Sequence, residues 1–521
     1  MASATTRRLL GALRHVTTSG GLLPAGAPTA PHFHIIESID DEFRMGLEHA
    51  SPKWLPIVGS LTTVLNIISK HGVHYLAWAE LAHKYGAVVG LRLGWTKYIL
   101  VAGKEAVSEG LSREEFDARP DGFVFRHRTM GVRRGVIFTD GDEWREQRRF
   151  SLRHLRDLGF GTRSMEYMLR EEAVEMASRL AEMGRKAGPG GMDVHKVYTI
   201  PVLNSLWVMT AGERYSHDDE RLLKFTGLVN RISRSVDVSG GLFNAIPFLR
   251  FLLPRFKEYD SLHKQMWSFF QETVKDHQRT LSDGHPRDLI DVYLRELQDR
   301  EEIQDSSFSQ SQLIALCKDL FSAGSETTSN TLGFATLFMV RYPDVQAKIH
   351  EELDRVVGRD RIPTVDDKIN LPYLNAVLLE VQRICNVAAQ SILHRSTADT
   401  EFMGYSIPKG SMLLFNLRSL HMDKEYWGDP EVFRPERFLI PGINGGPETV
   451  KNESWLIPFG MGRRRCLGEN LAKMSLYVFF SVISHAICFK NPPGCPPPPT
   501  KGVTGFTLGT GPFKAIVEPR Y

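Results

Sequence analysis

Phe459-Gly-Met-Gly462-Arg-Arg464-Arg-Cys466-Leu-Gly468 is the stretch that decides the fold of this chain. It predicts a tight loop that leads into a helix beginning near Cys466, because the sequence continues as ENLAKMSLYVFF. Gly462 permits a turn that would strain other residues, and Gly468 lets the backbone approach a flat ligand closely. A glycine-framed cysteine before a helix therefore marks a candidate ligand site.

Cys466 lies at the expected helix N-terminus, beside Arg463, Arg464 and Arg465. The helix N-terminus and the neighbouring arginines both favour the thiolate, so we expect a lowered pKa for this cysteine. A thiolate is the axial ligand that pushes electron density onto haem iron and favours O–O cleavage. Arg464 is placed to pair with a haem propionate. The alternative is a buried free cysteine near a basic loop, which is common for cysteine in general.

This pattern resembles the cysteine loop of the cytochromes P450, and the resemblance runs from about residue 50 to the C-terminus. It implies a monooxygenase with haem b, in which Cys466 binds the iron and Phe459 and Gly468 help to bind the cofactor. Electrons come ultimately from NADPH. The implied fold is mainly α (α+β), a large helix-rich haem-thiolate fold with small β-sheets and a long central helix over the haem. Residues 51–521 would form the catalytic domain, after a targeting or linker segment at 1–50.

The pattern of elements agrees with a mainly helical α+β body. Helical patterns dominate from about 140 to 385, with breaks at 188–191 and 240–241. Residues 86–103 predict a hairpin with Gly94 near its turn, and short strands return after 385. One long helix is expected from a capping box at Ser309 and Gln312 to Tyr342, where Pro343 ends it.

The long helix carries Ala323-Gly324-Ser-Glu326-Thr327-Thr328. Gly324 is expected to leave room over the iron, and Ala323 and Gly324 to lie against the cofactor. Splitting dioxygen needs protons, which Glu326 and Thr327 can relay through water as catalytic residues. The alternative for Thr327 is a hydrogen bond back to its own helix backbone, the more common fate of a threonine in a helix.

A buried charge cluster is implied by the resemblance at Glu380, Arg383 and Arg437. Glu380 and Arg383 share one helix face at i,i+3, on a helix opened by Pro372. Glu-x-x-Arg alone carries little information, because surface helices contain it often. Its order before the cysteine loop makes it informative, and its expected role is to hold that loop in place.

Three further side chains are expected at the haem propionates or the face behind the haem. Trp144 and Arg148, at i,i+4, can meet the same propionate, and the resemblance places His394 at a propionate as well.

Exposed arginines are predicted to form one basic stripe, which is either a solvated face or a docking surface for an acidic redox partner. They are Arg145, Arg149, Arg153 and Arg156, extended by Arg463 and Lys473.

Composition narrows the class of protein. The 64 basic and 61 acidic residues nearly cancel, so global charge does not indicate nucleic-acid binding. The five cysteines lack a CxxC pair, which argues against a disulfide framework or structural zinc and favours a reducing compartment. Residues 1–36 carry three arginines and no acid, which is typical of a transit peptide or of an unstructured start.

An apolar, lipid-like or foreign small molecule is the implied substrate: a lipid, steroid, terpenoid or xenobiotic. By analogy its pocket draws on residues 121–138, 236–250 and 387–393, on Phe506, and on the long helix near Phe321 and Ala323. The catalytic body resembles microsomal arthropod-type members, which implies a membrane surface at the cytosolic face of the endoplasmic reticulum and an NADPH–cytochrome reductase. The N-terminus implies instead a mitochondrion and its ferredoxin.

Two other classes of function stay open from the sequence. A haem-thiolate isomerase or dehydratase would rearrange peroxides without external electrons, although Glu326 and Thr327 argue against it. A haem-binding sink or sensor would bind carbon monoxide when reduced and consume no NADPH.

Overall fold

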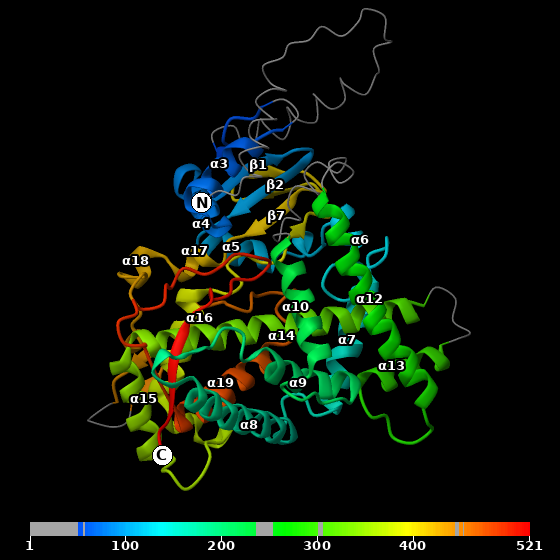
Figure 1. Ribbon diagram of the computed structural model, residues 1–521. Coiled ribbons are helices and arrows are strands. Elements are labelled where there is room, and N and C mark those ends of the chain that lie inside the picture. The colour runs from blue at the N-terminus through cyan, green and yellow to red at the C-terminus, as the bar shows by residue number, and fades with distance from the viewer. Residues whose placement is uncertain (1–49, 56–57, 236–253, 301–305, 443–447, 452) are drawn as a thin grey trace, which may run out of the picture.

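The computed structural model describes residues 50–55, 58–235, 254–300, 306–442, 448–451 and 453–521. Helices make up most of this part of the chain, and the strands gather in small sheets at its edges (Figure 1). The expected mainly α (α+β) class is confirmed. The segments 1–49 and 236–253, which include the expected targeting segment and part of the expected pocket, lie outside the described residues.

The α-helices and strands follow in chain order. The helices are α3 Leu61–His71, α4 His74–Tyr85, α5 Lys104–Ser112, α6 Phe123–His127, α7 Gly141–Asp157, α8 Arg163–Ala187, α9 Thr199–Ala211, α10 Glu220–Ser235, α12 Pro254–Thr280, α13 Leu289–Asp299, α14 Gln310–Arg341, α15 Pro343–Val356, α16 Pro372–Cys385, α17 Arg418–His421, α18 Lys424–Trp427 and α19 Glu469–Ala486. The strands are β1 Val88–Leu93, β2 Thr96–Val101, β3 Met192–Asp193, β4 His394–Arg395, β5 Thr400–Phe402, β6 Tyr405–Ile407, β7 Met412–Phe415, β8 Leu439–Ile440, β9 Thr449–Val450, β10 Ile487–Lys490 and β11 Lys514–Pro519.

The long helix α14 crosses the middle of the molecule (Figure 1). At its start the Ser309 side chain accepts a hydrogen bond from the Gln312 backbone N–H at 3.1 Å. The reciprocal half of the expected capping box is absent, because the Gln312 amide instead bonds both backbone groups of Gly135. Pro343 ends α14 as expected and begins α15. The helix thus ties its N-terminal end to the loop before α7.

The main sheet has the order β1-β2-β7-β4. β1 and β2 form the expected hairpin, with Gly94 in its turn. β2 pairs with β7 in parallel, and β7 pairs with β4 in antiparallel, with His394 opposite Leu413. This pairing brings the segment around 394 next to residues far earlier in the chain.

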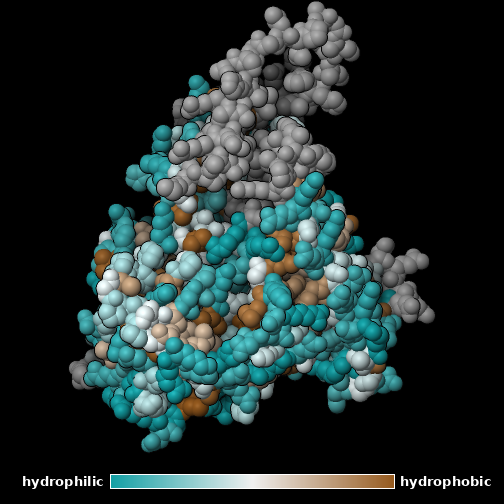
Figure 2. Space-filling model, viewed as in Figure 1, coloured by the Kyte–Doolittle hydropathy of each residue, from teal (hydrophilic) through white to brown (hydrophobic). Residues whose placement is uncertain are grey.

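The last helix, α19, is buried along most of its length and packs on α8, α14 and α15. It follows the cysteine loop directly, so the loop sits against the core rather than at the periphery. The face of the molecule in Figure 2 is mostly hydrophilic, with apolar side chains gathered toward its middle. Within the described ranges, no helix is both long enough and apolar enough to cross a bilayer.

Candidate active site

The cysteine loop is closed by its own backbone. The Cys466 N–H donates to the Phe459 carbonyl at 3.0 Å, and the Arg465 N–H donates to the Gly462 carbonyl at 3.2 Å. Gly462 has φ +70°, and a Cβ at this position would lie 2.0 Å from the Leu111 carbonyl oxygen of α5. No other residue fits there without moving α5, which confirms the expected need for glycine.

The expectation of a lowered Cys466 pKa is wrong for the protein without metal. Burial by the surrounding protein raises the pKa of the thiol, and this outweighs the lowering by the Gly468 N–H, Arg148 and Arg465. Cys466 is exposed, and it lines the cavity described below. The arginines beside it are also engaged elsewhere: Arg463 pairs with Glu114 and Arg465 with Glu469. A bound cation would favour the thiolate at this position.

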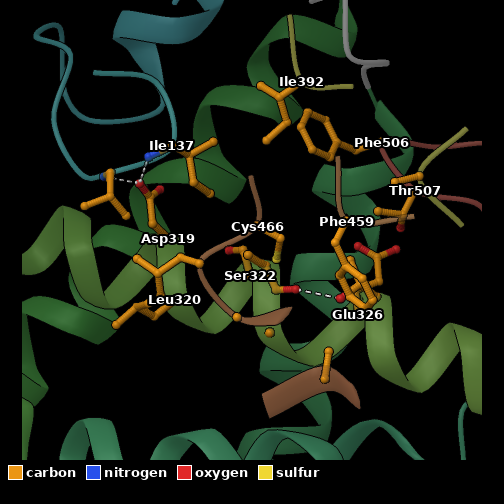
Figure 3. A pocket seen from close by; sticks show the side chains of 18 of the residues that line it. Ile137, Asp319, Leu320, Ser322, Glu326, Ile392, Phe459, Cys466, Phe506 and Thr507 are labelled. Carbon is orange, nitrogen blue, oxygen red and sulfur yellow. Dashed lines mark hydrogen bonds between the residues drawn. The ribbon is translucent and has the colours of Figure 1, made fainter. Parts of the chain in front are cut away.

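A cavity of about 430 Å³ lies between the cysteine loop and α14. Asp319, Ser322 and Glu326 follow one another along α14 beside it, and Ile392 and Phe506 point toward it from other segments (Figure 3). Every cofactor-binding residue expected from the sequence lines this cavity, namely Trp144, Arg148, Ala323, Gly324, His394, Phe459, Arg464, Cys466 and Gly468. Segments separated by more than 300 residues thus meet at one site.

One end of the cavity is strongly basic. The Arg464 guanidinium stacks on the Trp144 ring at 3.6 Å, and the Arg148 guanidinium lies 5.7 Å from the same ring. Arg464 Nε donates to the Asp117 carbonyl at 2.7 Å, whereas its Nη1 is buried and bonds no described residue. Burial lowers the pKa of Arg464 to about 10. An anion at this end would satisfy Nη1.

Arg119 belongs to the same end and was not singled out from the sequence. It is buried, and its Nη1 donates to the carbonyls of Ile392 and Leu393 at 3.0 and 2.8 Å. Burial and repulsion by Arg464 lower its pKa. No local pattern could have indicated it, because its carbonyl partners come from segments distant in sequence.

His394 is buried at the edge of the cavity, with Nδ1 2.7 Å from the Phe116 carbonyl. Nδ1 must carry the proton in this contact, and burial holds the pKa of the ring well below its usual value. The neutral ring then offers Nε2 only as an acceptor. A propionate contact at His394 therefore stays a prediction, and it requires protonation of the ring, which a neighbouring carboxylate would favour.

The residues present fit a haem. Cys466 presents its thiol to the cavity, and the basic end with the unmet Arg464 Nη1 suits the propionates. A Cβ on Gly468 would project to within 4.0 Å of the Cys466 sulfur, so the missing side chain leaves the cavity side of the loop open. A cysteine ligand and an anion-binding end are features that such a macrocycle needs.

On α14, Thr327 lines the cavity, and its hydroxyl donates to the Ala323 carbonyl at 2.9 Å. That is the backbone contact considered as the alternative, but it leaves the oxygen able to accept. Glu326 lies beside it and accepts from the Ser233 hydroxyl at 3.0 Å. Burial raises the pKa of this carboxyl, although hydrogen bonds from Ser233 and Thr507 oppose the shift. The two groups are therefore adjacent at the cavity, as expected.

Two expectations on α14 concern Gly324 and Phe321. Gly324 lines the cavity, and a Cβ there would lie 2.4 Å from Leu206 Cδ2, so the missing side chain also makes room for α9, while its role over the iron stays a prediction. Phe321 does not line the cavity: it is fully buried against Trp207, Phe225 and Phe270. Ala323 does line it. The helical period separates the cavity face from the core face, and Phe321 falls on the second.

The buried charge cluster forms as expected. Glu380 accepts from Arg383 Nε and Nη2 at 2.7 and 2.8 Å, and from Arg437 Nε at 3.1 Å. The Arg434 backbone N–H adds a contact at 2.9 Å. Glu380 and Arg383 are both fully buried, so the pair is isolated from solvent.

The cluster reaches the cysteine loop through His421. Arg383 Nη1 donates to the His421 carbonyl at 2.8 Å, and His421 Nε2 accepts from the Ile457 backbone N–H at 2.9 Å. Burial lowers the pKa of His421 to about 3, so the ring stays neutral and can accept. Ile457 lies two residues before Phe459, where the loop begins, which gives a physical path for the expected positioning role.

The arginines predicted as a basic stripe are all exposed on or beside α7: Arg145, Arg149, Arg153 and Arg156. Arg463 and Lys473 are exposed near the cysteine loop. Several of these cations are partly neutralised, since Arg145 pairs with Asp142, Arg463 with Glu114 and Lys473 with Glu469. Docking at this face stays a prediction.

Comparison with known proteins covers most of the chain. The cytochrome P450 family model matches residues 50–517. Farnesoate epoxidase of Bombyx mori is 40% identical over 473 residues, which is 90% of this chain and 93% of that protein. Probable cytochrome P450 303a1 of Drosophila melanogaster is 34% identical over 479 residues (90% and 94%). Cytochrome P450 2D15 of Canis lupus familiaris is 35% identical over 478 residues (90% and 92%).

Proposed function

The chain belongs to the cytochrome P450 family, and from this we propose that it epoxidises a linear unsaturated terpenoid such as farnesoate or its methyl ester. Its family makes it a haem b monooxygenase that acts on apolar small molecules with electrons ultimately from NADPH. The observation that carries the finer proposal is the 40% identity to a farnesoate epoxidase across nearly the full length of both proteins.

Cys466 would bind the iron, Phe459 and Gly468 would help to hold the ring, and Trp144, Arg148, Arg464 and His394 would bind the propionates. When bound, a haem with a thiolate ligand supplies oxygen activation by pushing electron density toward the O–O bond. The protein contributes position and electrostatics. Its basic end would orient the ring, and the apolar walls of the cavity would exclude water from the substrate side.

Glu326 and Thr327 would deliver protons. Burial raises the pKa of Glu326 and so favours the protonated form of this carboxyl, the form that can donate. The Thr327 hydroxyl already donates to the Ala323 carbonyl, so its oxygen can accept a proton donor such as a water molecule. This ordered pair supports a relay that ends at the cavity face of α14.

We place the protein at the cytosolic face of the endoplasmic reticulum, with an NADPH-dependent flavoprotein reductase as redox partner. The likeness to cytochrome P450 2D15 and to arthropod members supports this over mitochondrial ferredoxin. The exposed arginines Arg149 and Arg153 suit an acidic partner surface.

The test is turnover by the haem-loaded protein with NADPH, a purified cytochrome P450 reductase and either farnesoate or methyl farnesoate. An epoxide that forms only with NADPH and oxygen supports the proposal. Hydroxylation alone, or no product from either compound, refutes the terpenoid assignment. Rearrangement of a hydroperoxide without NADPH would indicate an isomerase instead.

A further inference from the structure

The cavity has a second polar region, which the roles assigned to Cys466, Glu326 and Thr327 do not use. It consists of Lys318 and Asp319 on α14, Arg128 just after α6, and His263 on α12, all of which line the cavity. Lys318 precedes Thr327 by nine residues, which is roughly 13 Å along a helix. An elongated ligand can therefore reach this region and the Cys466 side together.

Asp319 is fully engaged by the protein. One carboxylate oxygen accepts from Arg128 Nη2, and the other accepts from the backbone N–H groups of Val136 and Ile137 at 2.8 and 3.0 Å (Figure 3). Its side chain has no solvent exposure. The carboxylate holds the loop at 136–137 against α14 and leaves little capacity to bind a ligand.

The donors around Asp319 are not fully engaged. Lys318, which is only 2% exposed, donates to the Arg128 carbonyl and lies 2.9 Å from His263 Nδ1. Since Nδ1 accepts in this contact, the proton of a neutral His263 is on Nε2. His263 Nε2 and Arg128 Nη1 are both buried without a hydrogen-bond partner among the described residues.

Among the described residues, His263 Nε2, Arg128 Nη1 and the Lys318 ammonium all lack a negatively charged hydrogen-bond acceptor. Each buried donor without an acceptor costs about 1–3 kcal/mol, and a buried ammonium costs more without an anion. Burial and the nearby Arg128 hold the pKa of Lys318 well below its usual value. A carboxylate would supply acceptors for the N–H groups and the charge that restores the ammonium.

We infer that Lys318, His263 and Arg128 form a subsite for the carboxylate of an elongated acidic substrate, whose apolar tail then points toward Cys466. The inference rests on the proposed function for its choice of a terpenoid chain, and it goes further by favouring the acid over its ester. The subsite would set which end of the chain meets the reacting centre.

The test compares acids with their methyl esters by calorimetric titration of the haem-loaded protein. The probes are farnesoate and laurate, each with its methyl ester. The variants are Lys318→Met and His263→Phe, which keep buried volume and, for His263, the ring contact with Tyr259. Lys264→Gln is the matched control, because this neighbouring lysine is 65% exposed. Haem content and circular dichroism establish that each variant is folded.

The wild type and Lys264→Gln should bind each acid more tightly than its ester. Either cavity variant should reduce this preference by about tenfold to a hundredfold, the range for a hydrogen bond to a charged group. Equal affinity for acid and ester in the wild type, or an unchanged preference in both cavity variants, overturns the subsite. Lost preference with laurate but no binding of either farnesoate compound supports the subsite and refutes the terpenoid proposal. Epoxidation of methyl farnesoate without any preference for acids supports the terpenoid proposal and refutes the subsite.

Discussion

Replacing Glu380 with glutamine should destabilise the protein severely, although the side chain keeps its size. Glu380 accepts four hydrogen bonds, from Arg383 (two), Arg437 and the Arg434 backbone, and it is fully buried. An amide retains one carbonyl acceptor and places an NH2 group against the remaining donors. Among the described residues Arg383 then keeps no carboxylate partner, whereas Arg437 keeps Asp429. Breaking a buried ion pair in this way costs about 3–5 kcal/mol.

The matched control is Glu436→Gln. Glu436 immediately precedes Arg437 on the same 3-10 helix, Pro435–Phe438, is 44% exposed, and pairs with Lys348 at 2.7 Å. Solvent screens such a pair, so its loss should cost about 0–1 kcal/mol. The two variants make the same chemical change, and they differ in burial and in their connection to the cysteine loop.

The assay is equilibrium urea unfolding, followed by circular dichroism for the helices and by the haem absorbance band for the site. Glu380→Gln should lower both midpoints, and haem should be lost before the helices unfold, because Arg383 reaches the loop through His421 and Ile457. Equal midpoints for Glu380→Gln and Glu436→Gln would refute the reasoning. If haem is lost at the same urea concentration at which the helices unfold, only the path through His421 is refuted, and the stability argument stands.

Three further outcomes test the site. Cys466→Ala should abolish the carbon monoxide difference spectrum typical of a thiolate ligand, and a retained spectrum would refute the ligand assignment. Thr327→Ala should keep haem bound but divert electrons to hydrogen peroxide by at least about tenfold, as loss of a general acid predicts; unchanged coupling of NADPH to product would count against the relay. Arg149→Glu with Arg153→Glu should slow reduction by the reductase more at low than at high salt, and equal rates at both would remove these arginines from the docking face.

The sequence was sufficient for features that depend on neighbours along the chain. The cysteine loop, the glycine at 462, the hairpin at 86–103 and the long helix ending at Pro343 all rest on local spacing and backbone preference. Glu380 and Arg383 could be paired because i,i+3 residues share a helix face. Their partner Arg437 was reached only through the family resemblance.

Burial and long-range contact were decided by the tertiary structure alone. The Cys466 pKa was expected to fall because the arginines lie close in sequence, yet it rises because folding desolvates the thiol and pairs those arginines elsewhere. Gly324 proved to accommodate Leu206, and Arg119 joined the basic end through carbonyls from distant segments. A solvation energy or a contact between distant segments has no counterpart in local spacing, since both depend on which surfaces the whole fold removes from water.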